Sequence, residues 1–358
     1  MLSPTLISHH VLTIEIGEIP IRVHTDSREF AQMLEERYGE FVTAQAPLAL
    51  MEIEIELVKE PGRELRDSGL GKDDDADADV SVRREAGRWI MTRGDFRAEW
   101  DSESNRGWVR QRPSPYAIDG VLRILHSLIM ARAGGFLLHA ASAVRNGRAF
   151  VFAGVSGAGK TTLARLAPPD VTLLTDEISY VRPQGQVSGA RRQVPGGSGE
   201  ELEVRSQESG AKRQGESQIS NHKSQIANPQ SQTAHPESRT PNPEFRLPCS
   251  ESLTPDTRHL TPAFSAFGTP FAGELARIGK KVQAPLAAVF LLEQGPENRI
   301  EPLGEPEAAR DLLRHVLFFA RDEELVRMVF QTVCDFVRRV PVRRLVFTKD
   351  ARVWELIQ

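Results

Sequence analysis

Alternation of apolar and polar residues dominates the first part of the chain. Residues 11–23 (VLTIEIGEIPIRV) predict two short strands around a Gly-Glu turn, and residues 49–58 (ALMEIEIELV) predict another strand. Shorter alternating runs follow at 80–84, 89–92 and 96–100. The pattern therefore predicts a small antiparallel, β-rich N-terminal domain over residues 1–112.

Helical spacing interrupts this pattern twice. Asp26 and Ser27 can cap a helix that runs to about Tyr38. Residues 116–133 then repeat apolar side chains at helical spacing, and Gly134 ends that run.

The strongest local signal follows this helix. Residues 136–144 and 149–153 predict two buried strands joined by a tight turn with an Asn-Gly signal at Asn146. The second strand runs directly into Gly-x-x-x-x-Gly-Lys-Thr and a helical pattern, which is the context that a phosphate-binding loop requires. The predicted nucleotide-binding residues are Gly154, Val155, Ser156, Gly157, Ala158, Gly159, Lys160, Thr161 and Thr162.

The loop predicts a polyphosphate ligand. Glycines allow successive backbone N–H groups to face inward, and the following helix directs its positive end at the same point. Lys160 is expected to bridge the β- and γ-phosphates of ATP, and the Thr161 hydroxyl to contact Mg²⁺.

The elements after the loop predict an α/β core. A short helix stopped by two prolines leads to a buried strand at 171–175, and residues 285–292 are apolar enough for a central strand. Helices are predicted at 305–319 and 322–338, then a strand at 344–348 and a helical turn around Trp354. We expect a P-loop kinase-like core of mixed sheet with flanking helices, divided between residues 113–182 and 263–358.

The segment at 183–262 has a different composition. It is rich in Ser, Gln, Glu, Pro, Arg and Gly, and Phe245 is its only aromatic residue. A Ser-Gln dipeptide recurs there at a spacing of seven, but with too few apolar positions for a coiled coil. Such a segment cannot bury enough surface to offset its ordering entropy, so we predict a disordered insertion.

Composition narrows the function classes. The formal net charge of −4 and the pI near 6.2 give no reason to expect nucleic-acid binding. No run of about 18 apolar residues predicts a membrane span, and the N-terminus lacks a signal-peptide core. The two cysteines suggest neither disulfides nor a metal site, so a cytoplasmic protein is expected. Association with further copies of the chain stays open.

The aspartates at 73–79 resemble the start of a calcium loop. However, the glycine at the sixth position and the glutamate at the twelfth are missing. We therefore predict a solvated hairpin loop there rather than a metal site.

Asp176 and Glu177 are the candidate acids for phosphoryl transfer. A P-loop needs an acid for the metal and, when the acceptor is a hydroxyl, a base near the γ-phosphate. Asp176 follows Lys160 by sixteen positions, enough for one helix and one return strand. In a parallel sheet that strand would end beside the loop. Transporter-type ATPases carry their acid much further downstream, so the spacing favours a kinase; a solvated strand end is the alternative.

His139 lies among apolar residues in the strand before the loop. A packed core histidine is the simpler interpretation of that setting. Its closeness to the loop in sequence instead suggests that it orients Asp176 or holds a proton for it.

These motifs, taken together, resemble the HPr serine kinase/phosphorylase family and its shorter relatives, which share a P-loop branch with phosphoenolpyruvate carboxykinases. The resemblance rests on Leu-His-Ala-Ala around His139, on the loop, and on Leu-Thr-Asp-Glu ending at Glu177. It implies that Asp176 is the base acting on a serine hydroxyl of a protein or peptide, with His139 beside it. Thr161 and Glu177 would then hold the metal, and the N-terminal sheet could dock the substrate.

The chain departs from that family at two points. The family has Asp-Asp where this chain has Asp-Glu, and its longer glycine-rich signature does not follow the acids. Residues 268–274 occupy the corresponding region, and Glu274 is a candidate further metal or substrate contact. We therefore do not expect from the resemblance that HPr is the acceptor or that the chain catalyses the reverse phosphorylase reaction.

Two other functions stay open. A small-molecule kinase also keeps an acid soon after the loop, although such enzymes usually begin at the loop, which here lies near mid-chain. A nucleotide-sensing protein without turnover would keep the loop alone, whereas this chain also keeps Lys160, Thr161 and Asp176.

Overall fold

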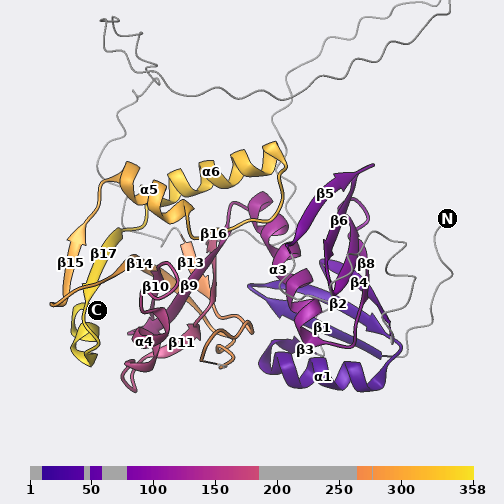
Figure 1. The fold of residues 1–358 in the computed structure, drawn as a ribbon, viewed down its shortest axis with the longest axis horizontal. Helices are drawn as coiled ribbons and strands as arrows, with labels where there is room; N and C mark the ends of the chain where they lie inside the picture. Colours follow the sequence, from indigo (N-terminus) through magenta and orange to yellow (C-terminus); the bar gives the residue numbers. More distant parts are fainter. Residues whose placement is uncertain (1–9, 44–48, 59–78, 185–263, 276) are drawn as a thin grey trace, which may run out of the picture. The chain divides into compact units, whose positions relative to one another are not determined.

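The computed structural model describes residues 10–43, 49–58, 79–184, 264–275 and 277–358, and these form two β-sheets with helices packed on them (Figure 1). The fold is therefore mixed α/β with a β-rich N-terminal region, as the sequence predicts. None of the helices in these ranges is both long enough and apolar enough to cross a membrane.

The first sheet contains eight strands in the order β3-β1-β2-β4-β8-β7-β6-β5. Its strands are β1 (His10–Ile16), β2 (Ile19–Thr25), β3 (Val42–Thr43), β4 (Met51–Leu57), β5 (Ser81–Glu85), β6 (Arg88–Arg93), β7 (Phe96–Asp101) and β8 (Arg106–Gln111). The six strands predicted in this region are confirmed as β1, β2, β4, β5, β6 and β7. Burial alternates most regularly along β2 and β7.

The prediction that this sheet is antiparallel is wrong for its centre. β4 pairs in parallel with β2 on one side and with β8 on the other. The connection from β2 to β4 contains helix α1 (Arg28–Tyr38), and a connection of that length can return the chain in the same direction. Alternation of side chains does not distinguish parallel from antiparallel pairing, so the sequence pattern could not reveal this.

Two capped helices cover the first core. The Ser27 side chain accepts a hydrogen bond from the backbone N–H of Phe30 at the start of α1, as predicted. Helix α3 (Pro115–Arg132) begins after Ser114 and buries most of its side chains. One apolar cluster includes residues of the first sheet, both helices and the strands that follow α3.

The second sheet contains nine strands, five of which close into a ring. Neighbours in the ring are β10, β9, β12, β13 and β14, and parallel pairing of β14 with β10 closes it. The strands are β9 (Phe136–Arg145), β10 (Arg148–Ala153), β11 (Thr172–Thr175), β12 (Ile178–Pro183), β13 (Phe264–Phe267), β14 (Gln283–Gln294), β15 (Arg299–Pro302), β16 (Val316–Leu317) and β17 (Val342–Phe347). The predicted central strand is β14, which lies between β10, β13 and β17.

The remaining helices are α4 (Lys160–Arg165), α5 (Glu305–Leu313), α6 (Glu323–Val337) and the 3₁₀ turn η2 (Ala351–Leu356). The helix predicted over 305–319 ends early, at Leu313. Val316 and Leu317 instead pair with Leu138 and Leu137 of β9, so tertiary pairing overrides the helical spacing.

The predicted disordered insertion and most of the aspartate-rich loop lie outside the described residues. The two ends of the insertion are nevertheless neighbours, because Pro183 of β12 pairs with Phe264 of β13 in an antiparallel ladder. Residues 184–263 therefore connect two adjacent strands. The domain boundaries drawn from the sequence stay predictions.

Candidate functional site

The predicted phosphate-binding loop is positioned by the β9–β10 hairpin. Asn146 and Gly147 form its turn with φ values of 53° and 73°, the left-handed pair that a two-residue hairpin requires. β10 then runs between β9 and β14 and ends at Ala153. Gly159, with φ of 107°, precedes α4, and a Cβ at this position would collide with the Phe347 ring. The strand–loop–helix context predicted from the motif is therefore present.

Lys160 folds back across its own loop. Its Nζ donates hydrogen bonds to the carbonyl oxygens of Gly154, at 2.7 Å, and Val155, at 3.4 Å. The side chain is 9% exposed, and this burial lowers the pKa of Lys160, while the negative charges of Glu274 and Glu177 act in the opposite direction. The amine thus caps the first two carbonyls of the loop, and the charges of two carboxylates act on it.

Thr161 lies beside Glu274, although 113 residues separate them in sequence. The Thr161 Oγ1 donates a hydrogen bond of 3.0 Å to Glu274 Oε2. Both side chains were predicted as metal contacts, and the fold brings them together. Hydroxyl and carboxylate oxygens are the ligands that Mg²⁺ prefers, so this pair fits the metal that a nucleotide would carry. In the described residues no group of three or more His, Cys, Asp or Glu side chains could hold a metal without such a ligand.

Asp176 follows the end of β11 and is 3% exposed. Its Oδ1 accepts the backbone N–H of Gly273 and its Oδ2 accepts that of Leu275, each at 2.9 Å. These two amides flank Glu274. The carboxylate of Asp176 therefore holds the segment that presents Glu274 to Thr161.

The parallel-sheet argument for Asp176 needs correction. β11 does not pair with β10; β9 lies between them and is antiparallel to both. Two strands that are each antiparallel to a third run in the same direction, so β10 and β11 still end at one edge of the sheet. A close backbone approach keeps the later loop on β11, because Thr269 donates to the Leu174 carbonyl, and a Cβ at Gly279 would overlap that carbonyl.

Glu177 is engaged by a cation that the sequence analysis missed. Both of its carboxylate oxygens accept from the Arg123 guanidinium of α3, at 3.0 and 3.3 Å. The same guanidinium lies 4.9 Å from the centre of the Phe271 ring. Arg123 had a signal in the sequence: together with Asp119 and His126 it forms a polar stripe at helical spacing on an otherwise apolar helix.

His139 is not a packed core residue, so that interpretation is wrong. Its side chain is exposed, between the buried Leu138 and Ala140 of β9. Partial desolvation and the positive charges of Lys160 and Arg123 lower the pKa of His139. Its backbone N–H donates to the carbonyl of His315, a second histidine whose pKa is lowered by burial and by Lys160. His315 follows a helix in the sequence, and no pattern marked it.

The other loop residues differ in their exposure. Val155 is 69% exposed at the loop, and Ala158 is buried. Gly157 has φ of 80° and open space where a Cβ would lie. The Gln294 side chain donates to the Gly157 carbonyl and so ties the loop to the end of β14. The carbonyl oxygens of Gly154 and Gly157 thus each accept a hydrogen bond from a side chain, those of Lys160 and Gln294.

No protein-family model matches this chain, and no curated protein matches its sequence. The resemblance described above therefore remains a prediction from the sequence.

Proposed function

We propose that the chain is an ATP- and Mg²⁺-dependent phosphotransferase that transfers the γ-phosphate to a hydroxyl, that of a serine in a small protein or peptide. The observation that carries this proposal is the convergence of Lys160, Thr161 and Glu274 at one strand end. A chance glycine turn gives no reason for a distant glutamate to face the motif's threonine. The proposed compartment is the cytoplasm.

In this proposal the chain acts by positioning and by neutralising charge. The backbone amides of the loop and the Lys160 ammonium bind the phosphates, and Thr161 and Glu274 hold the metal. ATP bound with Mg²⁺ supplies the phosphoryl group and a good leaving group. Glu177, paired with Arg123, adds negative charge opposite Lys160 and is a second carboxylate near the metal.

The acceptor hydroxyl must lose a proton, and Asp176 is the predicted base. Both of its oxygens already accept backbone hydrogen bonds. Each oxygen keeps a second lone pair, so Asp176 can accept a proton only from a hydroxyl that reaches this buried position. Exposed His139, whose lowered pKa keeps it neutral near pH 7, is the proposed partner that orients the acceptor.

Nucleotide binding tests the loop. Lys160→Ala should weaken ATP binding by about 100-fold, since two charge-assisted phosphate contacts are lost. Isothermal calorimetry would measure the affinity, with Lys280→Ala as the control, because Lys280 is exposed and paired only with Glu40 among the described residues. Unchanged affinity in Lys160→Ala would remove the loop from the proposal.

A phosphoryl-transfer assay tests which class of molecule is the acceptor. Native cell extract incubated with γ-labelled ATP and the purified chain should yield a labelled protein or peptide, and Glu274→Gln should abolish the label. A labelled small molecule would instead identify a small-molecule kinase. ATP binding without any labelled product would indicate a nucleotide sensor and contradict the proposed transfer.

A further inference from the structure

Strand β5 is an edge of the first sheet, remote in sequence from the P-loop. It pairs with β6 through a hairpin whose two-residue turn, Ala86-Gly87, has positive φ values. In such a hairpin the residues flanking the turn form a hydrogen-bonded pair, and bonded pairs alternate along the ladder. Glu85, Arg83 and Ser81 therefore bond to β6. The backbone N–H and C=O groups of Val82 and Arg84 point to the other side, where no described strand pairs with them.

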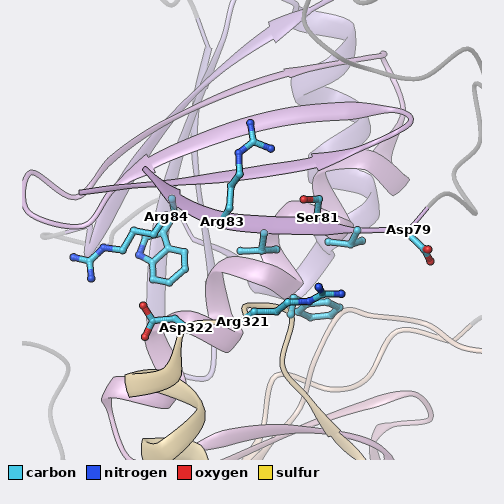
Figure 2. A pocket seen from close by; sticks show the side chains of 10 residues that line it. Asp79, Ser81, Arg83, Arg84, Arg321 and Asp322 are labelled. Carbon is cyan, nitrogen blue, oxygen red and sulfur yellow. The ribbon is translucent and has the colours of Figure 1, made fainter. Parts of the chain in front are cut away.

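This free edge borders a cleft. The cleft has a volume of about 610 Å³ and lies between β5 and the segment that enters α6 (Figure 2). Val82, Trp89 and Phe319 give it an apolar wall. In Figure 2, Arg83 and Ser81 point away from Arg321 and Asp322, so the cleft is formed by the opposite face of β5.

The cleft carries cations that lack carboxylate partners. Arg84, which lines the cleft, lies 5.7 Å from the centre of the Trp89 ring. Arg132 lies 6.0 Å from the same ring centre but does not line the cleft, and the charges of Asp322 and Glu324 act on it. Within the described ranges neither Arg84 nor Arg321 forms a salt bridge. Asp322 is already used, since its carboxylate caps α6 by accepting the N–H of Leu325.

The wall also contains an unused donor. Trp89 is 1% exposed, and its indole N–H has no acceptor among the described residues. This nitrogen is covered by protein atoms, so the donor does not face the open cleft. The outward N–H and C=O groups of β5 and the guanidinium groups of Arg84 and Arg321 are thus the polar groups available to a ligand in this cleft.

We propose that this cleft binds an extended acidic segment of a partner protein, which adds a strand to β5 and places carboxylates against Arg84 and Arg321. Only a peptide backbone matches the alternating donors and acceptors of a free strand edge. A nucleic acid or a lipid headgroup would meet the edge with acceptors alone and would leave the outward C=O groups of β5 without donors. The inference does not depend on phosphoryl transfer.

Binding of a defined probe tests the proposal. The probe is a fluorescent peptide of alternating glutamate and valine with blocked ends, titrated with the full chain and followed by anisotropy. The same peptide with lysine in place of glutamate should bind at least about tenfold more weakly. Two further peptides carry N-methyl groups on alternate amides, one set in each. One of them should lose binding and the other keep it, because only one set of amides faces β5.

Variants locate the site. Arg321→Glu should weaken binding of the glutamate peptide by about tenfold, since a charge pair is replaced by a repulsive one. Arg327→Glu is the control, because Arg327 is an exposed arginine of α6 that does not line the cleft. Arg321 precedes the helix and Arg327 is exposed on it, so both variants should keep the melting temperature of the parent chain.

Several outcomes would overturn the proposal. They are no binding of the glutamate peptide, equal binding of the lysine peptide, retention of binding by both N-methylated peptides, or no effect of Arg321→Glu. Changing the aspartates at 73–77 to asparagine should leave the affinity unchanged. A tenfold gain there would assign the cleft to the chain's own acidic segment instead of a partner.

Discussion

Asp119 of α3 and Asp176 at the end of β11 are almost equally buried, at 4% and 3% exposure, yet their surroundings differ. Asp119 accepts hydrogen bonds of 2.6 Å from the Arg37 guanidinium and from the Tyr38 hydroxyl, both on α1. Asp176 accepts only two backbone amides, and within the described ranges it has no cation. One carboxylate joins two helices, and the other holds a loop.

The difference separates a region in which the charged groups pair with one another from the site that we propose binds a nucleotide. The carboxylate of Asp119 is paired with the Arg37 guanidinium and the Tyr38 hydroxyl, so these groups have no charge that could bind a ligand. At the end of the ring Asp176 fixes the backbone on either side of Glu274, while Lys160 and His139 keep capacity for an anion. Replacing each group in turn should therefore reduce stability in the first region and activity in the second.

The largest expected effect is on stability at Asp119. Asp119→Ala leaves the Tyr38 hydroxyl buried without an acceptor and Arg37 without its partner, which should lower the free energy of unfolding by about 3–5 kcal/mol. Urea denaturation measures this. Asp335→Ala is the control, because its ion pair with Arg338 is about 60% exposed and should contribute less than about 0.5 kcal/mol. An equal loss of stability in both variants would show that the buried contacts of Asp119 contribute no more than an exposed ion pair.

The next effect is a pH dependence confined to the first region. Burial, with a smaller contribution from the charge of Arg182, lowers the pKa of His126 from 6.5 to about 4. Between these values the unfolded chain binds the proton and the folded chain does not, so stability falls as the pH falls. From pH 7 to pH 5 the loss should be about 2 kcal/mol.

His126→Phe isolates that contribution. Urea denaturation of the parent and the variant at both pH values should show a loss that is smaller by about 2 kcal/mol in the variant. The same pH dependence in both chains would show that His126 is accessible to protons in the folded state.

The substitution Asp176→Asn tests the second of the two carboxylates. An amide group can accept from only one of the two loop N–H groups, so the variant should lose about 1–2 kcal/mol of stability. If Asp176 also acts as the base, transfer should fall by at least about 100-fold with ATP affinity nearly unchanged. Glu274→Gln is the matched control: it should weaken the Mg²⁺ dependence of ATP binding without changing the unfolding midpoint. Full transfer by Asp176→Asn would leave Asp176 with a purely structural role.

The smallest expected effect concerns the link between the two regions. Arg123 lies one turn after Asp119 on α3 and reaches Glu177, the neighbour of Asp176. Both side chains are about a quarter exposed, so Arg123→Gln should cost only about 1 kcal/mol by urea denaturation. A loss as large as that of Asp119→Ala would mean that the two regions share one network.

Much of the local structure could be predicted from the sequence because its causes are local. The Gly-Lys-Thr motif, the Asn146-Gly147 turn and the Ser27 cap each depend on neighbouring residues, and each is present. The pairing of β10 with β14 joins segments more than 130 residues apart, and no periodicity encodes it. The same holds for Val316 and Leu317, which leave a helical pattern to pair with β9.

In the candidate site, too, local motifs identified residues but not their tertiary partners. The motif located Lys160 and Thr161, and strand spacing indicated Asp176 and Glu177. The partners of the two acids, which are the loop amides around Glu274 and the guanidinium of Arg123, come from other elements. Whether an acid faces a ligand, a backbone amide or a cation depends on tertiary contacts, which a single sequence does not reveal.

The pairing of Pro183 with Phe264 has a consequence for how this chain can vary. Two adjacent antiparallel strands need only a two-residue turn between them, so the ladder of β12 and β13 sets no upper limit on what is placed there. Doubling the length of a connection adds only about 0.6 kcal/mol to the free energy of closing it. Relatives of this chain could therefore differ by dozens of residues at this one junction and still share the same ring of strands.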